Sequence, residues 1–208
     1  MKKILDLTLP IRPHWRWKTE VTRTKEHEKG DYGQYSWIKI SAHSFTHVDS
    51  PLHNLPQGAE LSNVPLSNYY GDTAVVDVSF RGANEEITAK DLEANGRHIS
   101  RGDIALIKTN WQLKSNWESR EFWDYNPFLG MGGVRWLIAQ GVKAVAFDFP
   151  FTTHPEHEEF FRAGVVLIEY LTNVDKITQE RIQIYALPLN IEYKFEGAPA
   201  RVITFIDD

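Results

Sequence analysis

Apolar residues in this chain recur in short runs separated by turn-forming residues, a spacing typical of strands rather than of long helices. Residues 4–9 alternate weakly between apolar and polar side chains and stop at Pro10, which predicts a first strand. Residues 35–42 alternate more clearly, with Ile38 and Ile40 on one face. They predict a strand that leads directly into the first of several closely spaced histidines.

Continuous apolar runs predict four buried strands, at residues 73–78, 103–109, 142–147 and 165–168. Between them, Thr88 stands where an N-cap would begin a short helix, and residues 134–140 predict a short amphipathic helix that Gly141 closes. Because short strands alternate with a few helices, the pattern predicts a mixed α/β fold.

Two stretches are rich in aromatic side chains but lack a clear period. Trp15 and Trp17 lie in a proline-bounded N-terminal loop, where they either cover a core or line a pocket. Residues 111–133 form an aromatic insertion that contains Trp111, Trp117, Phe122, Trp123, Tyr125 and Phe128. A long loop of this kind predicts a lid or a pocket wall, and a dimer contact is the alternative interpretation.

Composition narrows the class of protein. With 208 residues and 42% hydrophobic side chains, the chain is long enough for one core, and we expect residues 1–208 to form one domain. The 23 basic and 28 acidic residues give a net charge of −5, which argues against a nucleic-acid partner and favours a small-molecule substrate. No apolar run approaches about 18 residues, so we expect no membrane span. The absence of cysteine excludes thiolate ligands and suits the cytoplasm.

The segment from His43 to His53 concentrates metal-ligand chemistry, because His43, His47, Asp49 and His53 fall within it. Imidazole and carboxylate are the mixed ligands that Zn, Mn and Fe accept. A single extended strand would separate His43 from His53 by roughly 30 Å. A continuous helix would place Pro51 in its interior, where it breaks the hydrogen-bond ladder. We therefore expect the chain to bend here so that these side chains meet.

This segment resembles a known family, the cyclase-like metal-dependent hydrolases that include bacterial kynurenine formamidase and isatin hydrolase. The family signature is H-x-G-T-H-x-D-x-P-x-H, and residues 43–53 read HSFTHVDSPLH. The one departure is Phe45, which stands where the family has Gly and which changes the backbone or the pocket wall there.

The distal half of the family pattern is H-x2-LL-x2-G-I followed by a Glu twelve residues after the His. Here His157, Phe160, Phe161, Gly164 and Val165 match it and lead to Glu169 at the same spacing. His157, rather than His154, is therefore the expected distal histidine. Residues 186–189 and 197–203 also resemble the family and are interpreted as the last strands.

The resemblance implies a role for each residue. His47, Asp49 and Glu169 would hold one divalent ion, and His43, His157 and a bridging carboxylate a second. His53 would stay off the metal and act as general base and then general acid. The ions would be one or two Zn or Mn, and hydroxide formed at the metal would hydrolyse the C–N bond of an aryl formamide or related small amide.

The resemblance also implies a fold and a partner. It implies a swivelling β/β/α-type, barrel-like mixed sheet with helices packed outside, and a homodimer or higher homo-oligomer. The N-terminal loop of the family often supplies an aromatic side chain to the substrate. We therefore expect a substrate pocket with walls from Trp15, Trp17, Phe45 and Trp111.

Two alternatives stay open from the sequence. One is an enzyme with a single Mn that opens a cyclic amide, as isatin hydrolase does. The other is a non-catalytic, metal-dependent binding protein, because Phe45 could crowd the site. A serine hydrolase is excluded, since the chain has no G-x-S-x-G motif.

Overall fold

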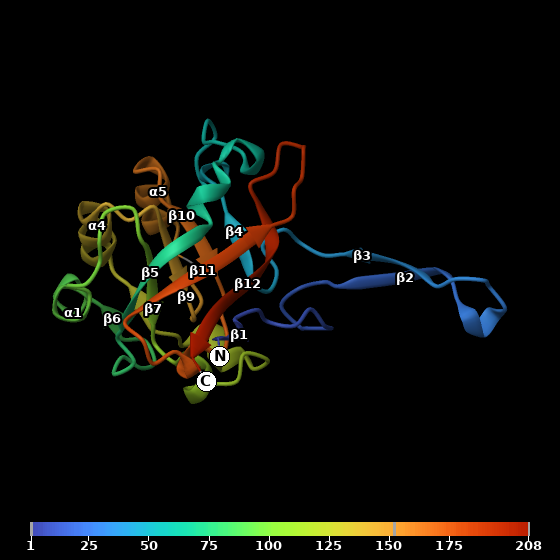
Figure 1. Cartoon of the computed structure of the whole chain (residues 1–208), viewed down its shortest axis with the longest axis horizontal. Coiled ribbons are helices and arrows are strands. Elements are labelled where there is room, and N and C mark those ends of the chain that lie inside the picture. The colour runs from blue at the N-terminus through green and yellow to red at the C-terminus, as the bar shows by residue number, and fades with distance from the viewer. Residues whose placement is uncertain (1, 152, 208) are drawn as a thin grey trace.

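A closed, mixed β-sheet forms the centre of the molecule in this computed structural model, which describes residues 2–151 and 153–207. The sheet order is β1-β12-β11-β5-β7-β9-β10-β4, and β12 also pairs with β4, so every strand of this sheet except β1 belongs to a closed ring (Figure 1). The strands are β1 Lys2–Asp6, β4 His47–Asp49, β5 Tyr70–Asp77, β7 Ile104–Lys108, β9 Ala144–Phe147, β10 Val166–Glu169, β11 Arg181–Pro188 and β12 Gly197–Asp207. This closed sheet with external helices confirms the predicted fold class.

Four of these strands, β5, β7, β9 and β10, run parallel, and helices connect them on the outside of the sheet. The helices α1 Ala89–Asn95, α4 Met131–Gln140 and α5 His154–Arg162 lie together on one side of the molecule (Figure 1). Helix α1 begins as predicted, because the Thr88 side chain accepts a hydrogen bond from the Asp91 backbone N–H in a capping box.

The buried strands face a hydrophobic core on each side. Successive side chains of a strand point to opposite faces. In β7, Ala105 and Ile107 accordingly pack in the cluster that includes the helices, while Ile104 and Leu106 pack in the second cluster with Val48 of β4. This two-sided burial explains why Ile104–Ile107 of β7 are all apolar rather than alternating with polar residues.

The predicted strand at residues 35–42 is a strand only at Tyr35–Lys39 (β3), and it does not join the central sheet. It pairs with β2 Glu20–Lys25 in a separate hairpin, whose turn includes the short helix η1 His27–Lys29. The β2–β3 hairpin extends far from the rest of the molecule (Figure 1), and every residue of β3 is exposed. Residues 40–46 then lead from this hairpin back to β4.

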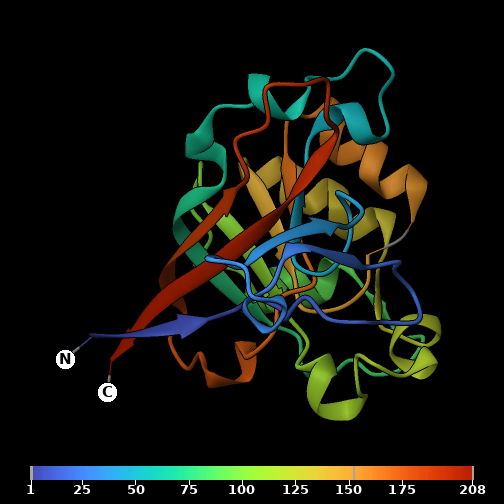
Figure 2. The ribbon, with the colours of Figure 1, turned by 90° about the vertical axis from the view of Figure 1, so that its right-hand side faces the viewer.

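The remaining elements are short and connect or cover the central sheet. They are η2 Pro51–His53, η3 Leu61–Asn63, η4 Leu66–Asn68, β6 Glu86–Ile87, α2 Trp111–Lys114, α3 Arg120–Asp124, β8 Phe128–Leu129 and η5 Val174–Lys176. The two chain ends lie side by side where β1 pairs with β12 (Figure 2). In the described part of the chain, every helix is too short or too polar to cross a membrane.

Candidate metal centre

Strand β4 presents His47 and Asp49 on the same face, because the two residues are two positions apart on a strand. The opposite face carries Val48, which packs in the core. The turn before β4 returns His43 to this face, so that its Nδ1 atom lies 2.7 Å from Oδ1 of Asp49. The chain therefore bends as the sequence predicts.

The turn after β4 brings His53 to the same place. Pro51 begins the 3-10 helix η2, and His53 ends it. Proline suits the first position because the N–H there would have no partner within the helix. The ring centroids of His43 and His53 lie 4.0 Å apart. A strand flanked by two tight turns thus collects all four polar residues of the segment.

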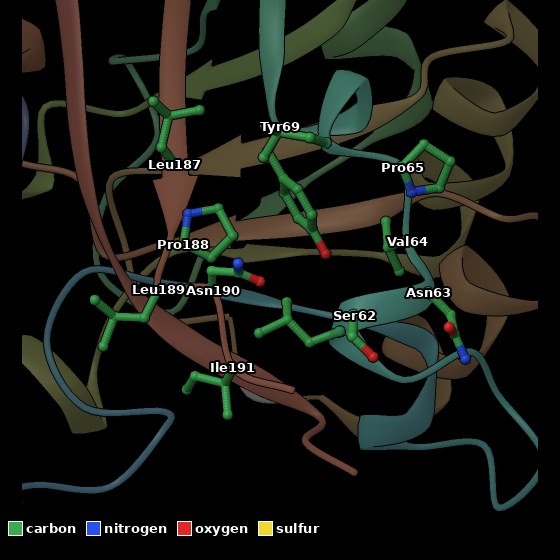
Figure 3. Close-up of a pocket in the computed structure, with 12 residues that line it drawn as sticks. Ser62, Asn63, Val64, Pro65, Tyr69, Leu187, Pro188, Leu189, Asn190 and Ile191 are labelled. Carbon is green, nitrogen blue, oxygen red and sulfur yellow. The ribbon is translucent and has the colours of Figure 1, made fainter. Parts of the chain in front are cut away.

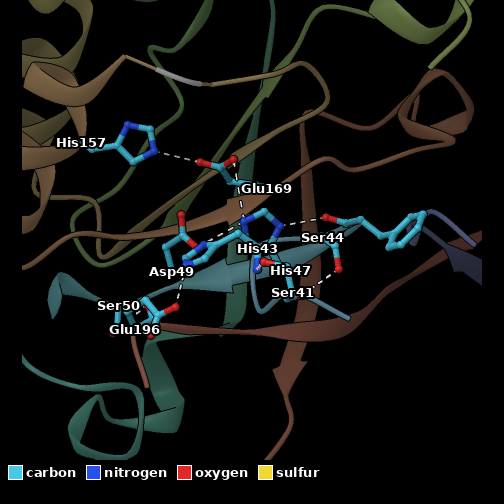
Figure 4. Close-up of polar contacts among 10 residues, drawn as sticks. Ser41, His43, Ser44, His47, Asp49, Ser50, His157, Glu169 and Glu196 are labelled. Atoms are coloured by element: carbon cyan, nitrogen blue, oxygen red, sulfur yellow. Dashed lines mark hydrogen bonds and ion pairs between the residues drawn. The ribbon is translucent and has the colours of Figure 1, made fainter. Parts of the chain in front are cut away.

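Glu169 and His157 join this group from elements that are distant in sequence. Glu169 is the last residue of β10 and lies opposite His47 in the antiparallel β10–β4 pair. His157 extends from α5, and its Nε2 atom lies 3.1 Å from Oε1 of Glu169. Figure 4 shows the two side chains meeting beside the β4 residues.

Two of the histidines are held in the orientation that a metal ligand needs. The Nδ1 atom of His47 lies 2.8 Å from the carbonyl oxygen of Phe45, and Nδ1 of His157 lies 2.8 Å from that of Thr153. Since a carbonyl oxygen only accepts, each Nδ1 carries a proton, and each Nε2 faces the carboxylates of the cavity, where it can bind a metal ion once its own proton is displaced. Backbone carbonyls thus fix both tautomers.

The ionisable groups of this centre compensate one another. Burial raises the pKa of Asp49, but the His47 charge and the hydrogen bonds from His43 and His47 outweigh it, so this pKa lies far below its ordinary value. Burial lowers the pKa of His43, yet Asp49 outweighs it and raises this pKa to about 8. Burial also lowers the pKa of His53, which Asp49 offsets only in part. Protons on the imidazoles thus compensate the negative charge of the buried carboxylates. A divalent cation can displace these protons and supply the positive charge instead.

The donor atoms fit a metal ion. One nitrogen of His47 and one oxygen each of Asp49 and Glu169 lie within 4.8 Å of one another, and all three residues are buried. This is the first ligand set that the resemblance implies. A second group within the same distance contains His43, Asp49 and His53. The structure therefore places His53, rather than His157, with His43, and the role of His53 away from the metal stays a prediction.

All six of these residues line one cavity of about 230 Å³, together with three more side chains. The lining is His43, His47, Asp49, His53, Phe151, His154, His157, Glu169 and Tyr170. The Phe151 ring stacks on the ring of His157 with centroids 4.6 Å apart. Phe151 and Tyr170 were not predicted from the sequence, and the position of Tyr170 directly after Glu169 is the one signal that could have identified it.

None of the aromatic residues predicted to form the substrate pocket lines this cavity. Trp111 is buried in the core, where its Nε1 donates a hydrogen bond to the carbonyl oxygen of Phe122, and Phe45 is buried as well. Trp17 packs against Phe45 with ring centroids 4.7 Å apart, and Trp15 donates from Nε1 to the carbonyl oxygen of Glu118. These side chains cover the core behind the cavity, because the N-terminal loop and the aromatic insertion pack on each other.

A larger groove of about 540 Å³ lies elsewhere, between the segment of η3 and η4 and the end of β11 (Figure 3). Its walls are mostly apolar, with Leu61, Val64, Leu187 and Ile191 among them. The Tyr69 hydroxyl points toward it but is buried beneath its surface. The groove holds none of the clustered histidines and carboxylates, so we place the reaction chemistry in the smaller cavity.

Comparison with known proteins agrees with this centre. The sequence profile of the Cyclase family matches residues 5–154, a stretch that includes His43–His53. A kynurenine formamidase of Erythrobacter litoralis is 30% identical over 201 residues, which cover 91% of this chain and 88% of the relative.

Solved structures give the same result. One described as a potential metal-dependent hydrolase with cyclase activity is 29% identical, with a TM-score of 0.79 and complete coverage of both chains. Isatin hydrolase A from Ralstonia solanacearum is 21% identical, with a TM-score of 0.84 over 99% of this chain and 92% of that chain, and it shares the fold. The resemblance to this family is confirmed, and the chain belongs to the Cyclase family of metal-dependent hydrolases.

Proposed function

We propose that this protein hydrolyses the C–N bond of an aryl formamide, or of a related small amide, with one or two Zn or Mn ions at the cluster around Asp49. The observation that carries the proposal is the convergence of His47, Asp49 and Glu169 within 4.8 Å in a buried cavity. The relative from Erythrobacter litoralis is named a kynurenine formamidase, so the formamide of kynurenine is the first substrate to test.

A divalent ion bound by these residues would lower the pKa of a water molecule and polarise the substrate carbonyl. The chain itself must then move a proton from the water to the leaving amine, because an amide nitrogen leaves as a neutral amine only after it is protonated. The hydroxide part of water adds to the carbonyl carbon, the C–N bond breaks, and the transferred proton goes to the nitrogen. The products are then a carboxylic acid and a neutral amine.

His53 is the candidate for this proton transfer. It lines the cavity beside His43, and its ring nitrogens form no hydrogen bond to any residue within 2–151 and 153–207. A neutral imidazole can accept a proton at one step and return it at the next. His43, in contrast, is already engaged by Asp49 and by Glu196, whose Oε1 lies 3.2 Å from its Nε2.

The size of the cavity favours a small acyl group. Its volume of about 230 Å³ lies below the roughly 300–1,000 Å³ of pockets that enclose drug-sized ligands. A formyl group and the adjoining nitrogen fit such a space, and the aryl ring of the substrate would then lie toward the cavity mouth. The apolar side chain of Phe151 is placed to contact the bound molecule.

The test begins with untagged protein that is stripped with a chelator and reloaded separately with Zn or Mn. Its hydrolysis of the formamide of kynurenine, of formanilide and of the cyclic amide isatin is followed by absorbance, and its metal content by mass spectrometry. We expect about one or two ions per chain and turnover of at least one aryl formamide. Protein that retains no ion and hydrolyses none of the three amides would refute the proposal.

The same assay separates the alternatives. One Mn per chain with turnover of isatin alone identifies a cyclic-amide hydrolase. Bound metal without any hydrolysis identifies a binding protein. We also propose the cytoplasm as the compartment. The chain has no cysteine and therefore none of the disulfides that are common in proteins of oxidising compartments.

A further inference from the structure

Tyr170 lines the cavity for an unusual conformational reason. It follows Glu169 directly, and consecutive side chains on a strand normally point to opposite faces. Tyr170 has a φ of 59°, which ends the strand, and both Glu169 and Tyr170 line the same cavity. A bulky side chain at positive φ costs about 1–3 kcal/mol, and Gly or Asn would adopt this conformation at lower cost. The site therefore places a tyrosine where the backbone alone favours a smaller residue.

The surroundings hold the Tyr170 ring on several sides, and only 7% of the residue is exposed. The ring meets Trp123 edge to face, with centroids 5.1 Å apart, and Trp17 lies behind it at 5.9 Å. Toward the cavity, its centroid is 5.0 Å from that of His47. The Tyr170 carbonyl oxygen accepts a hydrogen bond of 2.7 Å from the Thr46 hydroxyl. The ring is therefore fixed before any substrate arrives.

The cavity offers few other neutral hydrogen-bond donors. Among the described residues that line it, Tyr170 is the one with a hydroxyl group. The carboxylates of Asp49 and Glu169 only accept when ionised, and the Nδ1 protons of His47 and His157 are already donated to backbone carbonyls. The Tyr170 hydroxyl interacts with the Glu169 side chain and therefore lies at the metal-centre end of the cavity. A substrate carbonyl that binds there meets it as a donor.

We propose that Tyr170 is a further catalytic residue, whose phenolic hydroxyl donates a hydrogen bond to the amide carbonyl oxygen and stabilises the negative charge that develops there. The inference rests on the proposed amide hydrolysis. A donor fixed in advance and shielded from water is effective because it needs no reorganisation when the charge appears. The aromatic cluster of Trp17 and Trp123 would then serve the reaction indirectly, by holding the Tyr170 ring.

The test is Tyr170→Phe in the full-length, metal-loaded protein, with Tyr125→Phe as the matched control. Tyr125 follows α3 and is 53% exposed. For formanilide we expect Tyr170→Phe to lower kcat by about 10²–10³-fold with KM changed little, because the lost bond forms mainly in the transition state. The metal content should equal that of the wild type, and the control should match the wild type in all respects.

Two results would overturn the role. Wild-type kcat in Tyr170→Phe would show that the hydroxyl does not contact the reacting oxygen. Loss of metal, with normal kcat after saturation with the ion, would show that Tyr170 only orients Glu169. Since Phe keeps the ring contacts, we expect a normal thermal melt. Tyr170→Asn is a second variant without the phenolic hydroxyl. Asn tolerates positive φ, so this variant retains the backbone conformation.

Failure of the proposed function is recognised separately. If the metal-loaded wild type does not hydrolyse formanilide, its binding of formanilide can be measured directly by calorimetry. Binding weakened about tenfold in Tyr170→Phe, equivalent to roughly 1.4 kcal/mol, would still support the hydrogen bond to the carbonyl. Equal binding by both proteins, or no binding by the wild type, would reject it.

Discussion

The Nδ1 atom of His43 lies 2.7 Å from Oδ1 of Asp49, although His43 belongs to a turn and Asp49 ends strand β4. The same oxygen lies 3.3 Å from Nε2 of His47. Asp49 also belongs to both groups of potential metal ligands. One buried carboxylate therefore connects the two halves of the candidate metal centre.

We expect Asp49→Ala to lose its bound metal and to lower amide hydrolysis by at least about 10²-fold, because both ligand groups lose their shared carboxylate. Mass spectrometry of protein purified without a His tag measures the first effect, and the amide assay the second. Asp124→Asn, a change at an exposed carboxylate of α3, is the control. Full metal content in Asp49→Ala would contradict the assignment.

His53→Ala should keep the metal and lose turnover, by about 10²–10⁴-fold, as expected for removal of a general acid–base group. Metal content and kcat are measured on the same sample. His154→Ala is the comparison, because His154 lines the same cavity but belongs to neither ligand group. If His53→Ala loses metal, His53 is a ligand together with His43 and Asp49, and its role as the base is wrong.

Asp91 predicts a pH dependence of stability away from the metal centre. Burial raises the pKa of Asp91, but hydrogen bonds from Arg81 and Thr88 outweigh it and hold the pKa below its ordinary value. A lowered pKa means that the stabilisation is present above about pH 4 and is lost as the pH falls through the pKa of the folded state.

Asp91→Asn should therefore lower the free energy of unfolding by about 0.5–1.5 kcal/mol at pH 7, the usual net contribution of a hydrogen bond, because the charged acceptor of Arg81 and Thr88 becomes a neutral amide. The difference from the wild type should shrink at acid pH, as measured by urea denaturation. Glu93→Gln, at an exposed position of the same helix, is the control. If the difference in free energy of unfolding between the two proteins stays constant from pH 7 to acid pH, the charge of Asp91 does not stabilise α1.

The β2–β3 hairpin bears on the predicted homo-oligomer. Trp37 is 71% exposed and Tyr35, on the same face of β3, is 59% exposed, and an isolated two-stranded hairpin is marginally stable in water. We propose that a second copy of this chain covers these side chains, since burial of apolar area is favourable. Sedimentation velocity should give a dimer that Trp37→Ser weakens, while Arg23→Ser on the same hairpin does not. A monomeric wild type would reject the proposal.

The elements that the sequence predicted well depend on local chemistry. Thr88 caps α1 because its hydroxyl and the N–H of Asp91 are three residues apart in the chain. Residues 104–107 of β7 are all apolar because the strand is buried on both faces. The candidate ligands were found because residue types and spacing within residues 43–53 are informative without tertiary detail.

The features that the sequence did not reveal depend on packing or on backbone torsion angles. The alternation of β3 is the same in a half-buried strand and in a projecting hairpin, so it did not exclude the central sheet. The sequence does not distinguish an aromatic side chain in a core, such as Trp111, from one in a pocket wall. Tyr170 faces the cavity because of a φ of 59°, which no neighbouring residue type indicates.

Strand β4 has only three residues, yet it pairs with both β10 and β12 and thereby closes the ring of strands. Two of its three side chains, His47 and Asp49, are candidate ligands. An ion bound to them would therefore also stabilise the pairing of β4 with β10 and β12. An ion at 100 times its Kd adds about 2.7 kcal/mol to the folded state. Chelation should therefore speed amide hydrogen exchange in β4 and at the facing ends of β10 and β12, while β5 and β7 stay protected. Occupation of the metal centre and closure of the barrel would then be a single equilibrium.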